Sequence, residues 1–149
     1  MPLVKIDMVK GVRSPEEIKR LADVVQEVML AKFNAPPRDR YQIITQHEPY
    51  ELIMEDTNLG FERTDALVFI QIFQQGRTAE MKKAIYAELA ERLNKECGLP
   101  KTDLIISVAR NEREDWSFGL GRAQFLEGGF VDENKGMGDV EGVSWSRSS

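Results

Sequence analysis

The sequence predicts an α/β (α+β) domain in which two tandem strand-helix-strand units form one four-stranded sheet with both helices on one face. Two stretches with helical spacing of apolar residues each lie between strand-like stretches. Landmarks of the first half recur in the second half at a constant offset of 64 residues. The length of 149 residues suits one domain with a core of its own.

The first unit begins with a strand at residues 3–9 (LVKIDMV), in which alternate residues are apolar. A helix follows, because Ser14 is a good N-cap and Pro15 suits the first helical position. The apolar stripe of this helix consists of Ile18, Leu21, Val25 and Val28. Prolines at 36–37 end the segment, and a second strand is expected within residues 40–47 (RYQIITQH).

The second unit repeats this plan, with strands at 66–73 (ALVFIQIF) and 104–108 (LIISV) on either side of a helix that Thr78 caps. Its apolar positions are Met81, Ile85, Leu89 and Leu93. The landmarks that lie 64 residues apart are Pro2 and Ala66, Ser14 and Thr78, Pro36 and Pro100, and Asp39 and Asp103. Each unit should therefore hold two parallel strands joined by a right-handed crossover.

The strand at 66–73 is apolar on both of its faces. Since the two helices would cover only one face of the sheet, self-association is the economical way to cover the other. The stretch 111–125 (NEREDWSFGLGRAQF) is rich in charge, glycine and aromatic residues, which favours a short hairpin or an arm. We expect one domain at 1–130 and a polar tail at 131–149.

Composition excludes several classes of function. Lys and Arg number 20 against 25 Asp and Glu, and the net charge of -5 argues against partners such as nucleic acid or an anionic membrane. A single cysteine, Cys97, excludes an internal disulfide and fits a reducing compartment, so a cytoplasmic protein is expected. With one histidine, His47, the chain lacks the usual ligand cluster of a metal site.

Three residues of unusual character should meet at one edge of the sheet. Pro2 begins one strand and Asp39 directly precedes its parallel neighbour. Removal of Met1 would turn Pro2 into a secondary amine. If a pseudo-twofold axis relates the two units, the third strand runs antiparallel to the first, and its end (FQQGRT) brings Arg77 to the same edge.

Each of these residues also has an ordinary structural interpretation. Arg77 lies at a helix N-terminus, where a cation is poorly placed unless an anion binds there, but it could be a loop arginine paired with Glu80. Asp39 could be a turn residue that binds its own backbone. Trp116 and Phe118 could line the site or simply pack the arm.

Taken together, Pro2, the tandem plan and the motifs DRYQIITQH, EDTNLGF, GRT and DWSFG resemble the tautomerase superfamily, specifically its malonate semialdehyde decarboxylase branch. The likeness extends over residues 2–127. It implies a homotrimer, a catalytic amino-terminal proline, a small oxo acid as substrate and no cofactor.

The resemblance also suggests individual roles. Pro2 matches the catalytic proline, Asp39 the aspartate that activates water or orients the substrate, and Arg77 a carboxylate-binding arginine. Trp116 and Phe118 match an aromatic wall.

Two further residues, Gln75 and Tyr41, are expected to contact the substrate. Gln75 marks a departure, because some members of the branch have an Arg-x-Arg pair and glutamine stands here at the first position. That departure bears on the decarboxylase assignment more than on the fold. The related cis-3-chloroacrylic acid dehalogenases use a histidine near the first helix, which this chain lacks, so dehalogenation is disfavoured.

The two enzymatic hypotheses differ in the protonation state of Pro2. A neutral amine is a base that can catalyse keto-enol tautomerisation. A protonated amine is an acid that can assist decarboxylation of a 3-oxo acid, with a possible hydratase side activity, and the nearby Asp39 favours this form. The alternative class is a non-catalytic binding protein of the macrophage migration inhibitory factor type.

Overall fold

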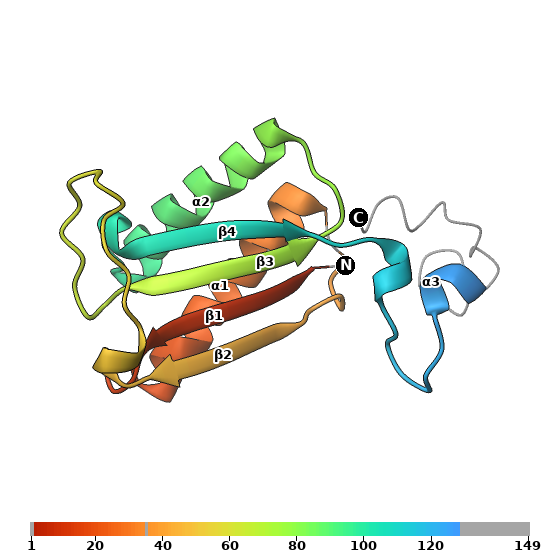
Figure 1. The fold of residues 1–149 in the computed structure, drawn as a ribbon, viewed down its shortest axis with the longest axis horizontal. Helices are drawn as coiled ribbons and strands as arrows, with labels where there is room; N and C mark the ends of the chain where they lie inside the picture. The colour runs from red at the N-terminus through yellow and green to blue at the C-terminus, as the bar shows by residue number, and fades with distance from the viewer. Residues whose placement is uncertain (1, 35, 129–149) are drawn as a thin grey trace.

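A computed structural model describes residues 2–34 and 36–128 and confirms the four-stranded sheet. The strands are β1 (Leu3–Val9), β2 (Gln42–His47), β3 (Val68–Gln74) and β4 (Leu104–Arg110). Their order is β2-β1-β3-β4 (Figure 1). Within each unit the strands are parallel, and the units join through the antiparallel pair β1 and β3. The expected tail at 131–149 lies outside the described residues.

The helices α1 (Pro15–Phe33) and α2 (Ala79–Cys97) have 19 residues each. Their first turns are stabilised by the predicted N-caps, because the hydroxyls of Ser14 and Thr78 each accept a hydrogen bond from a backbone N–H three residues later. Helix α1 ends before the prolines, at Asn34, whose φ of 53° is left-handed. Residues 36–128 also contain four short helical turns: η1 (Pro49–Glu51), η2 (Lys101–Asp103), η3 (Arg113–Asp115) and α3 (Gln124–Glu127).

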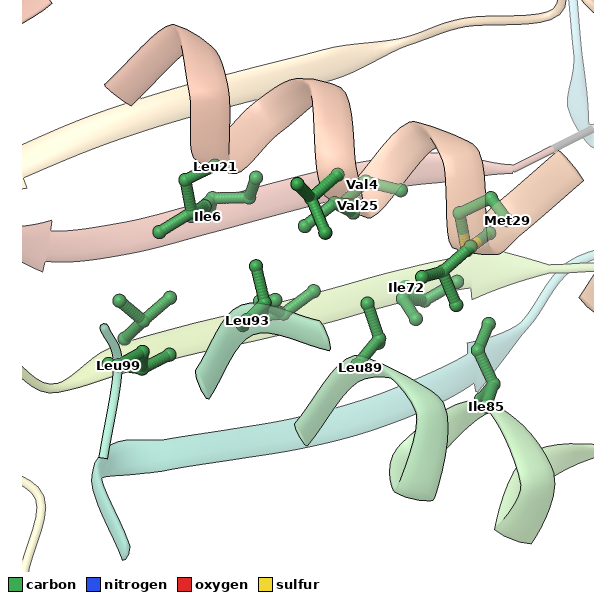
Figure 2. Packing of buried hydrophobic residues seen from close by; sticks show 14 of the residues in the cluster. Val4, Ile6, Leu21, Val25, Met29, Ile72, Ile85, Leu89, Leu93 and Leu99 are labelled. Atoms are coloured by element: carbon green, nitrogen blue, oxygen red, sulfur yellow. The ribbon is translucent and has the colours of Figure 1, made fainter. Parts of the chain in front are cut away.

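Both helices cover the same face of the sheet, and the core lies between these two layers (Figure 1). Apolar side chains of the strands and helices interdigitate there; the labelled ones in Figure 2 are Val4, Ile6, Leu21, Val25, Met29, Ile72, Ile85, Leu89, Leu93 and Leu99. On the opposite face Leu3, Phe69 and Phe73 remain only half-buried in the single chain. None of the described helices is long and apolar enough to cross a membrane.

The segment after β4 forms an arm that extends past the end of the sheet (Figure 1). Of the two alternatives, the hairpin does not form, because residues 111–128 contain η3 and α3 but no strand. Left-handed φ angles at Gly119, Leu120 and Gly121 interrupt any extended run there. Within the arm, Phe125 packs against Trp116 and Phe118 in a small aromatic cluster that is separate from the main core.

Candidate active site

The predicted site residues lie at the edge of the sheet where β1 and β2 begin and β3 and β4 end. The start of the chain lies beside the ends of β3 and β4 (Figure 1). The backbone N–H of Val4 donates to the carbonyl of Tyr41 over 2.9 Å. Pro2, which is buried, therefore lies against the segment that carries Asp39 and Tyr41.

Asp39 is a buried carboxylate without a hydrogen-bonding partner. Its side chain is 5% exposed, and neither carboxylate oxygen has a partner among the described residues. The turn is closed instead by its backbone N–H, which donates to the carbonyl of Pro36 over 3.0 Å. Burial raises the pKa of Asp39 to about 6, although the positive charge of the amino terminus opposes the shift. An unpaired buried carboxylate is costly, which is typical of a functional site.

The aromatic residues predicted for the site do lie together. The ring of Tyr41 is 5.9 Å from the rings of both Trp116 and Phe118, and the latter two stack at 5.2 Å. Burial, with the nearby charge of Asp39, raises the pKa of the Tyr41 hydroxyl. The indole Nε1 of Trp116 is buried without a partner among the described residues. These three rings therefore form an aromatic wall, of which Tyr41 lies near Asp39.

Arg77 is held at the end of α1. Its guanidinium donates to the carbonyl of Phe33 over 3.3 Å and lies 5.2 Å from the centroid of that ring. It forms no ion pair with Glu80 or any other described residue. A cation near the C-terminus of α1 interacts favourably with the negative end of the helix dipole. Arg77 therefore stabilises α1, a structural role that the sequence pattern did not indicate. Its Nε is buried and has no hydrogen-bond partner among the described residues.

Three further residues of this edge were missed by the sequence analysis. Gln74 is 1% exposed, Phe125 packs against Phe118 at 5.4 Å, and Arg110 lies over the backbone of Gly76. A Cβ atom at Gly76 would come within 3.2 Å of the Arg110 guanidinium carbon. The predicted residue Gln75 is also buried here, next to Gln74.

The opposite edge of the sheet provides an internal comparison. The counterparts of Pro2 and Asp39 there are Ala66 and Asp103. Asp103 is fully buried, but its two carboxylate oxygens accept hydrogen bonds from the backbone N–H and the hydroxyl of Thr64, at 2.7 and 2.5 Å. Arg13, the counterpart of Arg77, donates to the carbonyl of Ala66 over 2.7 Å. At equivalent places in the two units, the Asp103 carboxylate thus has hydrogen-bond partners, whereas the Asp39 carboxylate beside Pro2 has none among the described residues.

Two family models described as tautomerase enzymes match the chain, one over residues 2–62 and the other over residues 39–119. Among curated relatives, the probable tautomerase YrdN of Bacillus subtilis (strain 168) is 47% identical over 128 residues, which cover 86% of this chain and 98% of the relative. The probable tautomerase YusQ of the same organism is 41% identical over 128 residues, covering 85% of this chain and all of the relative.

Among solved structures, a malonate semialdehyde decarboxylase with decarboxylase and hydratase activities is 40% identical to this chain. The TM-score is 0.81, with 87% of this chain and 99% of that chain covered. The malonate semialdehyde decarboxylase from FG41 is 38% identical, with the same TM-score. A member of the cis-3-chloroacrylic acid dehalogenase family, at 18% identity and a TM-score of 0.66 over 80% of each chain, shares the fold.

The substitution Asp39→Asn should change how stability depends on pH. The pKa of the Asp39 carboxyl is about 6 in the folded protein, against an ordinary value of 3.8. The protonated carboxyl therefore contributes its full stability below pH 3.8, and this contribution is lost as the pH rises to about 6. Asparagine does not titrate. From pH 4 to pH 7, the unfolding free energy of the variant relative to the wild type should therefore rise by about 2 kcal/mol.

Urea denaturation at pH 4, 5, 6 and 7 measures this difference. The control is Asp65→Asn, at an exposed loop position, whose curve should run parallel to that of the wild type. A parallel curve for Asp39→Asn as well would mean that the Asp39 carboxylate is not destabilised by burial.

Proposed function

Because the chain belongs to the tautomerase family, in its malonate semialdehyde decarboxylase-like branch, we propose that it is a cofactor-independent enzyme that acts on small oxo acids through the amino group of Pro2. The observation that carries the proposal is the buried, unpartnered carboxylate of Asp39 beside the start of β1. A domain that needed Asp39 only for a turn would satisfy these oxygens, as Thr64 does for Asp103 at the opposite edge.

The charges of the site favour Pro2 in its protonated form. With a pKa of about 6, Asp39 is mostly ionised at neutral pH, and an anion close to an amine stabilises the ammonium form. Protonated Pro2 can donate a hydrogen bond to the aldehyde oxygen of a 3-oxo acid. The bond between the α-carbon and the carboxylate carbon then breaks and carbon dioxide leaves. The electron pair forms an enolate, which the proton of the Pro2 ammonium converts to the enol.

The remaining residues would bind the substrate. Arg77 has a free Nε for the substrate carboxylate, and Gln75 lies two residues before it in the position that would otherwise hold a second cation. The wall formed by Tyr41, Trp116 and Phe118 excludes water from one side of the site. A small, flat oxo acid fits this combination of one cation and stacked rings.

Keto-enol tautomerisation is the second candidate activity, and the names of both curated relatives favour it. The fraction of Pro2 that is neutral can remove a proton next to a carbonyl and return it to another atom. A panel of 3-oxo acids, 2-oxo acids with their enols, and acetylenic acids separates decarboxylation, tautomerisation and hydration. Absence of turnover on the whole panel at high protein concentration would favour a binding protein.

Pro2→Ala should lower kcat/KM by the 10²- to 10⁴-fold that is typical of a positioned acid or base. Intact mass should show that active protein lacks Met1, because an amide nitrogen at Pro2 is not basic. Pro15→Ala, at the exposed start of α1, is the matched control and should keep full activity. Equal turnover by Pro2→Ala and the wild type, or by protein that retains Met1, would remove Pro2 from the mechanism.

Arg77→Ala should lower kcat/KM at least about tenfold, mainly through KM, since a charge-assisted hydrogen bond to the substrate is lost. Arg77→Lys should recover little, because lysine lacks the planar fork of arginine. Arg20→Ala removes an exposed arginine of α1 that pairs with Glu96 and should leave the kinetics unchanged. If Arg77→Ala lowers thermal stability but not kcat/KM, its contact with Phe33 is its whole function.

We also propose that the protein is a trimer in solution. The half-buried side chains of Leu3, Phe69 and Phe73 form an apolar surface on the face of the sheet that the helices leave open. Light scattering should report about three times the chain mass. Phe69→Lys should weaken the trimer, whereas Ala87→Lys on the exposed side of α2 should not. A wild-type monomer at micromolar concentration would contradict this proposal.

A further inference from the structure

Gln74 occupies a core-facing position directly across the sheet from Pro2. Along β3, residues 68, 70 and 72 are buried toward the helices, and Gln74 continues this alternation. In the antiparallel register of β1 and β3, Leu3 faces Phe73 and Val4 faces Ile72. One more step places Pro2 opposite Gln74. Opposed residues of such a pair have Cβ atoms about 4.5 to 5.5 Å apart, within reach of a glutamine side chain.

The carboxamide of Gln74 is buried and has no partner. Its side chain is 1% exposed, and among the described residues neither Oε1 nor Nε2 makes a hydrogen bond. The backbone carbonyl of Gln74 does have a partner, because it accepts a hydrogen bond from the N–H of Asn111 over 2.9 Å. An amide buried in this way costs stability unless another group completes its hydrogen bonds. An apolar side chain would serve the core better at this position.

The backbone nitrogen of Pro2 accounts for a glutamine at position 74. While Met1 is attached, the nitrogen of Pro2 is a tertiary amide that carries no hydrogen and is a poor acceptor. After Met1 is removed, the same atom is a secondary amine, which in its protonated form has two hydrogens to donate. Oε1 of Gln74 can accept one of them. The other then remains free for the substrate oxygen, while the nearby Asp39 carboxylate stabilises the positive charge of the ammonium.

We propose that Gln74 is a positioning residue that accepts a hydrogen bond from the Pro2 ammonium and so directs its second proton into the site. The inference rests on the proposed use of the Pro2 amine, and it adds a residue to that mechanism. Nε2 of Gln74 remains available to donate to the substrate oxygen that the ammonium polarises. Gln74 thereby fixes the direction of the amine within the sheet, which the ring of Pro2 alone does not.

Stability tests the hydrogen bond independently of turnover. Gln74→Met keeps the side-chain volume and removes both polar atoms. It should lower the urea midpoint of protein that lacks Met1, because the ammonium loses its acceptor. In protein that retains Met1 behind an uncleaved amino-terminal extension, the same substitution should leave the midpoint unchanged or raise it. An equal effect in both forms would overturn the proposal. Gln74→Leu repeats the comparison in case methionine packs poorly.

Kinetics give the second readout. In protein without Met1, Gln74→Met should lower kcat about tenfold with little change in KM, since one hydrogen bond in the transition state is lost. Gln46→Met, at an exposed position of β2, is the matched control and should keep the wild-type kcat. An unchanged kcat for Gln74→Met would also overturn the proposal. If the wild type turns over no oxo acid while the stability difference persists, the proposed function fails and the Gln74 contact stands.

Discussion

The antiparallel pairing of β1 with β3 is the constraint on which the rest of this structure depends. Each strand-helix-strand unit is complete in itself, but only this central pairing decides which ends of the two units meet. It brings the start of β1, the turn before β2 and the ends of β3 and β4 to one edge (Figure 1). A shift of one residue in this pairing would move Gln74 from the core-facing side of the sheet to the other side.

That edge contains polar groups whose burial is not compensated within the chain. Neither the Asp39 carboxylate nor the Gln74 carboxamide has a partner among the described residues, and Nε of Arg77 and Nε1 of Trp116 are also unpartnered. Each such group lowers stability, and the two layers of apolar side chains farther along the sheet supply the compensation. Binding of a small anionic molecule would satisfy several of these groups together, which links the cost in stability to function.

The two halves of the chain place equivalent residues in the same local geometry but in different hydrogen-bonding environments. Asp103 and Asp39 occupy equivalent places, yet Thr64 completes the hydrogen bonds of the first and no described residue completes those of the second. Ala66 lies within the chain, so its nitrogen belongs to a peptide bond and cannot become an amine. The unpartnered groups lie at the opposite edge of the sheet, beside Pro2.

The sequence by itself determined the elements, their repetition and several of the residues that meet at one edge of the sheet. Ser14 and Thr78 identify the helix starts because capping is a local interaction, and alternation within 3–9 and 66–73 identifies the strands because each strand has one buried face. The grouping of Asp39 with Tyr41 and Pro2 also followed from strand order.

Tertiary structure alone decided the contacts that cross between units. The interaction of Arg77 with the end of α1, the position of Arg110 over Gly76 and the placement of Gln74 opposite Pro2 join residues that are 34 to 72 positions apart in the sequence. No local pattern encodes such contacts, because they depend on the register between strands and on the angle at which a helix packs. A buried glutamine looks like any strand residue until the register shows what faces it.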